Sequence, residues 1–197
     1  MMYKSQYNTP QHFENLYKIF SNERFLNKEG LGGELAFFIH SFPAHLQSQV
    51  DLNVSSLIKR LQNNGIEILE VNLYLLCMGI IKQKNLFEKI QDQEKGIPKR
   101  RLLKILNGPL NIETAVMPEI LRRVNEACPK IIFLTGIGAA FPIIRSHTIL
   151  NNLPTLIGEM PLVLFFPGTY NNQSLTLFDR LKDDNYYRAH NLNDYKI

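Results

Sequence analysis

The chain has 197 residues, of which 45% are hydrophobic and 20% are charged, with a net charge of +4 and a pI of about 9.0. This length suits one sizeable domain, and the composition excludes an intrinsically disordered chain. No apolar run approaches the roughly 18 residues of a membrane span, and residues 1–15 lack the apolar stretch of a secretory signal, so we expect a cytoplasmic protein.

Helix and strand patterns alternate along the chain. Phe13, Leu16 and Phe20 follow the spacing of an amphipathic helix, which predicts a helix over residues 10–20. Further helices are predicted at residues 52–63, 74–94, 98–107, 117–127 and 146–157. Short apolar runs between turn residues predict strands at 35–39, 66–73, 130–134 and 162–166, with a fifth short strand near 187–192. Asn53 or Ser55 is expected to cap the second helix, and Pro167 is expected to stop the fourth strand.

Strands separated by helices predict an α/β fold. We expect a single domain over residues 1–197, with residues 1–23 as an N-terminal helical extension. Its sheet is expected to be mainly parallel and Rossmann-like, with four to five strands flanked by helices. The residues expected in the central sheet are Phe37, Ile68, Phe133 and Val163. Ligands and partners of such sheets bind at the carboxyl ends of strands.

A glycine-containing loop, Thr-Gly-Ile-Gly at residues 135–138, follows a predicted strand. Glycines at this place allow backbone N–H groups to approach a phosphate. The dinucleotide pattern G-x-G-x-x-G is incomplete because Phe141 occupies its last position, and Pro142 lacks a donor. A tight turn at a strand end is therefore favoured over a nucleotide site.

Polar side chains gather directly after this loop: Arg145, Ser146, His147, Asn151 and Asn152. Arginine offers a planar fork for carboxylate or phosphate, and histidine can move protons near neutral pH. Ser146 could act as a nucleophile with His147, but adjacent residues rarely face each other as a Ser–His pair requires. We therefore favour partner contacts or structural hydrogen bonds, with Ser146 as a helix N-cap.

A second polar cluster lies near the C-terminus: Asp183, Asp184, Tyr186, Tyr187 and Arg188. Paired carboxylates can bind a hard metal, although adjacent carboxylates are common in solvated loops. A hydrogen-bonded Asp–Arg network that fixes the last strand is favoured, and Tyr and Arg are enriched at protein interfaces. We expect Arg145 and Arg188 to be tied to acidic or carbonyl groups, because an unpaired buried guanidinium is costly.

One basic cluster stands out on a predicted helix, made of Lys99, Arg100, Arg101 and Lys104. Such a face can contact nucleic-acid phosphates, but a solvated helix face is the favoured interpretation. The histidines lack zinc-site spacing, and Cys77 and Cys128, without a CxxC motif, are predicted to be buried small hydrophobes. We therefore expect no catalytic residues, no metal and no cofactor.

Several long segments together resemble the BrxB family of BREX phage-defence systems. The most specific are residues 145–153, RSHTILNNL, and residues 185–189, NYYRA, and the resemblance covers nearly the whole chain. It implies a small accessory component of a system with a DNA methyltransferase, a large ATPase and a phosphatase-like PglZ-type protein, which marks host DNA and blocks phage replication. It also implies the PglZ-like subunit as the direct partner, and it supplies no catalytic residues.

The leading hypothesis is a non-catalytic accessory or adaptor subunit that binds the PglZ-like component, with other BREX components as further partners and no membrane. One alternative is a nucleic-acid-binding subunit of the same system, supported by the pI and the basic cluster. The other is a degenerate nucleotide-binding enzyme built around Gly136 and Gly138.

Overall fold

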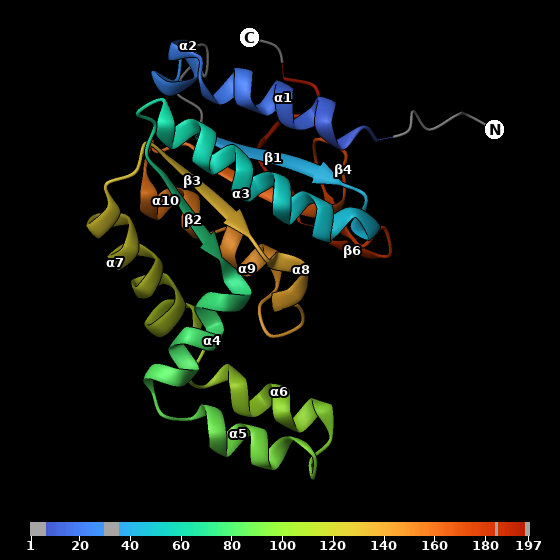
Figure 1. Cartoon of the computed structure of the whole chain (residues 1–197). Helices are drawn as coiled ribbons and strands as arrows, with labels where there is room; N and C mark the ends of the chain where they lie inside the picture. Colours follow the sequence, from blue (N-terminus) through green and yellow to red (C-terminus); the bar gives the residue numbers. More distant parts are fainter. Residues whose placement is uncertain (1–6, 30–35, 184, 196–197) are drawn as a thin grey trace, which may run out of the picture.

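The computed structural model describes residues 7–29, 36–183 and 185–195. Within them, one sheet has helices on both faces (Figure 1). The strands are β1 (Phe37–Phe42), β2 (Ile68–Asn72), β3 (Ile131–Thr135), β4 (Leu162–Tyr170), β5 (Leu175–Leu177), β6 (Leu181–Asp183) and β7 (His190–Asn191). The α/β class is confirmed, and Phe37, Ile68, Phe133 and Val163 lie in β1 to β4 as predicted.

The sheet is mixed, with seven strands among the described residues rather than four to five. Strands β2-β3-β4-β1-β7 lie side by side in parallel, and β5 and β6 add an antiparallel hairpin to the end of β4. The expectation of a mainly parallel sheet missed this hairpin. Pro167 does not stop β4, because the strand pairs with β1 as far as Pro167 and then with β5 from Gly168 to Tyr170.

The helices are α1 (Thr9–Phe20), α2 (Glu23–Leu26), α3 (Gln47–Asn63), α4 (Leu73–Gln83), α5 (Phe87–Glu94), α6 (Lys99–Asn107), α7 (Met117–Ala127), α8 (Ile137–Ala140), α9 (Ser146–Leu150) and α10 (Leu153–Ile157). A 3₁₀ turn at Ala44–Leu46 precedes α3, and a π-helical turn at Ile112–Val116 precedes α7. The predictions for α1, α6 and α7 are confirmed.

Three helix predictions need correction. The helix predicted from residue 52 begins at Gln47, so Asn53 and Ser55 bond to carbonyls inside it instead of capping it. The helix predicted over residues 74–94 breaks into α4 and α5, where Asn85 takes a positive φ of 55°. The helix predicted over residues 146–157 is divided into α9 and α10, with Pro154 at the start of the second, since proline suits a first turn.

Two apolar cores lie on the two faces of the sheet, because successive side chains of a strand point to opposite faces. In β3, Phe133 belongs to the core under α1 and α3, whereas Ile132 and Leu134 belong to the core under α4, α7 and α8 to α10. Phe13, Leu16 and Phe20 of α1 are buried in the first core. The helical N-terminal segment is therefore packed against the sheet.

The carboxyl ends of β1, β2, β3 and β4 share one edge of the sheet, because these strands run parallel. The elements that follow them, the 3₁₀ turn before α3, α4, α8 and the β5–β6 hairpin, begin there. The polar segments singled out in the C-terminal third follow β3 and β4.

Candidate functional site

Asp183 is the centre of a hydrogen-bonded cluster that joins the two predicted polar segments. Its Oδ2 accepts a hydrogen bond from the Tyr187 hydroxyl at 2.6 Å and lies 3.4 Å from Ser146 Oγ. The same oxygen lies 3.7 Å from His147 Nδ1. Its Oδ1 accepts from the backbone N–H of Asn185 at 3.1 Å and from the side-chain amide of that residue. We call these five residues the Asp183 cluster.

The electrostatics of the cluster favour an ionised Asp183. Burial alone would raise the pKa of this carboxyl, but hydrogen bonds from Tyr187 and Asn185 outweigh it and lower the pKa below its ordinary value. Burial raises the pKa of Tyr187, and its bond to Asp183 raises it further. Tyr187 therefore stays protonated and acts as a donor to the carboxylate.

The geometry does not resemble a Ser-His-Asp triad, although those residue types meet. In a triad the serine hydroxyl bonds to the imidazole, which in turn bonds to the carboxylate. Here Ser146 Oγ and His147 Nδ1 both approach Oδ2 of Asp183. The partner of Ser146 Oγ is thus the carboxylate and not the imidazole, so His147 is not placed as its base. Ser146 is the first residue of α9, and Arg145 occupies the N-cap position expected for Ser146.

Tyr170 holds the polypeptide after β6 in place. Its hydroxyl donates to the carbonyl oxygens of Tyr187, at 3.1 Å, and of Ala189, at 3.0 Å. The backbone N–H of Tyr187 donates to the carbonyl of Gln173 at 2.9 Å. Sequence reasoning missed this anchor, and the only signal was an aromatic residue at the end of an apolar strand.

The remaining predicted residues do not join the cluster. Asn151 is exposed at the end of α9, and the Asn152 amide donates to the carbonyl of Thr148. Tyr186 is 65% exposed. Asp184 lies outside the described residues.

Arg145 and Arg188 were expected to be tied to acidic or carbonyl groups, and this prediction is wrong within the described ranges. Both are exposed, and neither guanidinium bonds to another described residue. The prediction assumed burial, whereas exposed guanidinium groups keep water as their partner.

The glycines of residues 135–138 are explained by close packing. A Cβ on Gly136, where φ is +69°, would lie 2.2 Å from Oδ1 of Asn72, and that oxygen accepts from the Leu75 N–H at the start of α4. A Cβ on Gly138 would lie 2.9 Å from Phe178 and 3.0 Å from Pro167. Protein atoms thus occupy the space beside both glycines, in accord with the tight turn favoured above.

A comparison with known protein families identifies the family of this chain. The family model described as "BREX protein BrxB" matches residues 69–192. The chain belongs to the BrxB family. It is 38% identical over 174 residues to a BREX protein BrxB of Bacillus cereus (strain H3081.97), covering 86% of this chain and 90% of that protein. It is 31% identical over 172 residues to the BREX protein BrxB of Escherichia coli O9:H4 (strain HS), with 87% and 85% covered. No solved structure matches.

The BrxB match contains the whole Asp183 cluster, since its residues lie between Ser146 and Tyr187. It also contains the basic cluster on α6, which Figure 1 shows in the α5–α6 hairpin at the bottom of the view, apart from β6. The two groups of predicted site residues are therefore separate surfaces. In the described ranges, no three His, Cys, Asp or Glu side chains form a metal-binding group.

A crevice of about 760 Å³ lies at the carboxyl ends of β1 and β4. His45 and Thr169 line it together with Asp179, which accepts a hydrogen bond from the Thr169 hydroxyl. Nearby, His40 is buried on β1, where desolvation lowers its pKa to about 3, and its Nε2 lies 2.7 Å from the Tyr7 hydroxyl. Sequence reasoning did not predict that these residues converge, because their chain positions give no sign of it.

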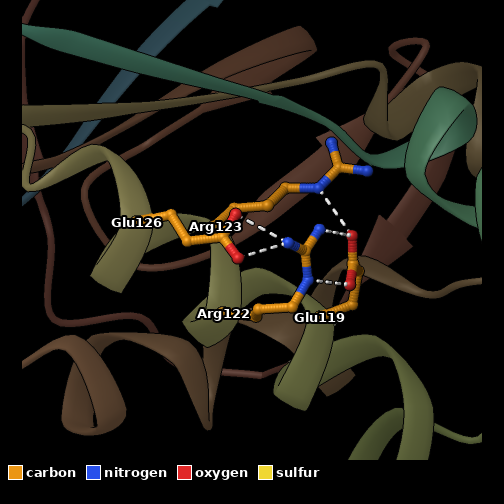
Figure 2. Close-up of polar contacts among 4 residues, drawn as sticks. All are labelled: Glu119, Arg122, Arg123 and Glu126. Atoms are coloured by element: carbon orange, nitrogen blue, oxygen red, sulfur yellow. Dashed lines mark hydrogen bonds and ion pairs between the residues drawn. The ribbon is translucent and has the colours of Figure 1, made fainter.

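An ion-pair network on α7 was also missed (Figure 2). The Glu119 carboxylate accepts from Arg122 and from Arg123, and Arg122 also bonds to Glu126. The i, i+3 and i, i+4 spacing of opposite charges was the available signal.

Among the cysteines, Cys77 is buried as predicted, but Cys128 is exposed because it caps the end of α7 with a φ of +43°. No helix in the described ranges is both long and apolar enough to cross a membrane.

Proposed function

We propose that this protein is a non-catalytic adaptor subunit of a BREX phage-defence system and that it binds the PglZ-like component. Membership of the BrxB family supports the assignment to a BREX system, because the relatives carry the name BREX protein. Other BREX components are plausible further partners. The choice of a PglZ-like protein rests on the family resemblance set out above.

The single observation that carries the non-catalytic role is the direction of the bonds in the Asp183 cluster. Ser146 and His147 supply a hydroxyl and an imidazole, yet both approach the carboxylate of Asp183. The relay from serine hydroxyl to imidazole to carboxylate, which activates the serine of a triad, is therefore not formed. The cluster is suited to hold the segment after β6 in a fixed conformation.

The surface presented by that segment suits protein binding. Of the large apolar side chains that are exposed in the described ranges, three lie close together in sequence: Phe178 at 37%, Leu181 at 44% and Tyr186 at 65% exposed. Arg180 and Arg188 are exposed beside them. Tyr and Arg dominate binding hot spots, so we assign the partner contact to this C-terminal surface, defined as the exposed side chains of residues 178–183 and 185–188.

Affinity measurement with a purified PglZ-like protein of the same system tests the proposal. The wild-type chain is expected to form a stable complex, and Tyr186→Ala is expected to weaken it by about 2 kcal/mol, which is roughly 30-fold. Tyr74→Ala serves as the matched control, because Tyr74 is exposed on α4 and lies outside the C-terminal surface. Its complex should keep wild-type affinity.

Two results would contradict the adaptor role. One is the absence of binding between the wild-type chain and every BREX component. The other is ATPase, nuclease or methyltransferase turnover by the isolated chain that disappears in the folded variants Arg145→Ala or His147→Ala.

A further inference from the structure

Helices α5 and α6 form a hairpin that lies away from the strands, at the opposite end of the molecule from α1 and α2 (Figure 1). Its base is held by Leu106, which is buried in one of the two cores, and by Lys84, whose Nζ donates to the Pro109 carbonyl at 2.9 Å. No residue of α5 is buried, and in α6 only Leu106 is. The hairpin is therefore a projecting element with most of its side chains in water.

The basic charge of the hairpin is concentrated on α6. This helix carries Lys99, Arg100, Arg101 and Lys104 and has no acidic residue, whereas α5 carries Glu88, Asp92 and Glu94. All four cationic side chains are exposed, and none of them bonds to another described residue. Positions i, i+3 and i+4 share one side of a helix, so Arg100, Arg101 and Lys104 form a single positively charged face.

Three of these four charges do not stabilise the helix that carries them, and only Lys104 lies in its last turn, where the dipole favours a cation. Lys99, Arg100 and Arg101 occupy the first turn of α6, where the positive end of the helix dipole repels cations. The preceding residue, Pro98, provides no capping hydrogen bond, whereas Asn8 and Asn72 cap α1 and α4. First-turn cations that weaken their own helix are expected to have a role outside the fold.

The opposite side of α6 is already occupied. Leu106 is buried, and Leu102 packs against the same core, so the main apolar side of α6 is unavailable for insertion into a lipid surface. The charged face is free, and a row of exposed guanidinium and ammonium groups is complementary to a phosphate backbone. We propose that the Arg100–Arg101–Lys104 face of α6 binds the phosphates of duplex DNA without reading its sequence. This activity goes beyond the adaptor role and does not depend on it.

Fluorescence anisotropy with the full-length chain and a labelled duplex of about 25 base pairs, at about 50 to 200 mM salt, tests the inference. We expect binding of the wild type whose logarithm of affinity falls linearly with the logarithm of salt concentration. The variant Arg100→Gln/Arg101→Gln/Lys104→Gln is expected to bind at least about tenfold more weakly at the lowest salt. Its salt slope should be smaller by about 2.7, which is about 0.9 for each lost phosphate contact.

A charge-matched control separates this face from net charge. Lys18→Gln/Lys59→Gln/Lys130→Gln removes the same charge from exposed positions outside the hairpin and should bind DNA as the wild type does. The α6 variant should be about as stable as the wild type, because it removes two cations from the positive end of the dipole and one, Lys104, from the favourable last turn. If it fails to fold, the single variants Arg100→Gln and Lys104→Gln replace it, each with an expected slope change of about 0.9.

The inference is overturned if the wild type does not bind the duplex at low salt, or if the α6 variant and the control lose affinity equally. Binding to anionic lipid vesicles in place of DNA would also overturn it. The α6 variant should still bind the PglZ-like protein, so a failure of DNA binding and a failure of the adaptor role are distinguishable.

Discussion

At the scale of single residues, Glu119 shows how neighbouring charges fix an ionisation state. Hydrogen bonds from Arg122 lower the pKa of this carboxyl from 4.5 to about 2, and bonds from Arg123 contribute to the same shift, against the opposing effect of burial (Figure 2). A carboxyl whose pKa is lower in the folded state stabilises the fold above its unfolded pKa. That contribution is present above pH 4.5 and is lost as the pH falls towards 2.

We therefore expect Glu119→Gln to lower the free energy of unfolding by about 1 kcal/mol at pH 6 and low salt, a value already reduced for solvent screening. The difference from the wild type should shrink between pH 4.5 and 2. Urea denaturation across this pH range measures it, with Glu88→Gln, an exposed carboxyl on α5, as the control. A difference that stays constant down to pH 2 would contradict the assignment.

The prediction of single residues succeeded where the polarity of a side chain was enough to single it out. It failed where the hydrogen-bond partner of that side chain had to be known. Ser146, His147, Asp183 and Tyr187 were singled out from their types and positions, and they do meet. Their shared acceptor was not predictable, because Ser146 and Asp183 are separated by 37 positions and meet only through the fold. Arg145 was expected in a network for the same reason, and it is exposed.

At the scale of elements, the turn after β3 links two βα units. Gly136 takes a φ of +69°, and its missing Cβ leaves room for the Asn72 side chain, which caps α4 at the end of β2. The ends of β2 and β3 are thus held together by one glycine and one asparagine.

Gly136→Ala is expected to destabilise the protein by about 1 to 3 kcal/mol. The new Cβ would sit 2.2 Å from Asn72 Oδ1, so either the turn or the cap must shift. Thermal or urea unfolding measures the loss, and Gly96→Ala is the control because the nearest atom to its Cβ would be 3.8 Å away. Equal stability of the two variants would contradict this account of the turn.

Element boundaries were hardest to predict where residues took unexpected backbone conformations. The β5–β6 hairpin was missed because its turn uses Phe178 and Asp179 at φ of +56° and +57°, positions usually marked by glycine or asparagine. The break between α4 and α5 depends on Asn85, also at positive φ. Strands β1, β3 and β4 were recognised correctly because burial on both faces leaves a strong apolar pattern, whereas the partly exposed β2 was recognised from its alternation of apolar residues.

At the scale of the whole molecule, the two cores depend on a sheet whose central strands come from distant parts of the chain. Strand β1 lies between β4 and β7, and α1 covers the face that holds Phe38, Phe133 and Phe165. Phe20 of α1 packs directly against Phe133, with ring centroids 5.2 Å apart. The family match begins at residue 69, yet the fold described here relies on elements that precede it.

Removal of residues 1–23 tests whether that segment is an extension or part of the core. It deletes the buried side chains of Phe13, Leu16, Ile19 and Phe20, each worth about 1.5 to 3 kcal/mol, or roughly 6 to 12 kcal/mol together. Whole domains are stable by only about 5 to 15 kcal/mol, so the shortened chain should show no cooperative unfolding transition by circular dichroism.

The control is Phe20→Ala, which leaves the helix in place. Its free energy of unfolding should fall by about 3 to 5 kcal/mol, and it should keep a single, earlier transition if the native stability exceeds that loss. A sharp transition near the wild-type midpoint in the shortened chain would mean that the core under α3 is stable without α1, and that residues 1–23 are an extension in the thermodynamic sense.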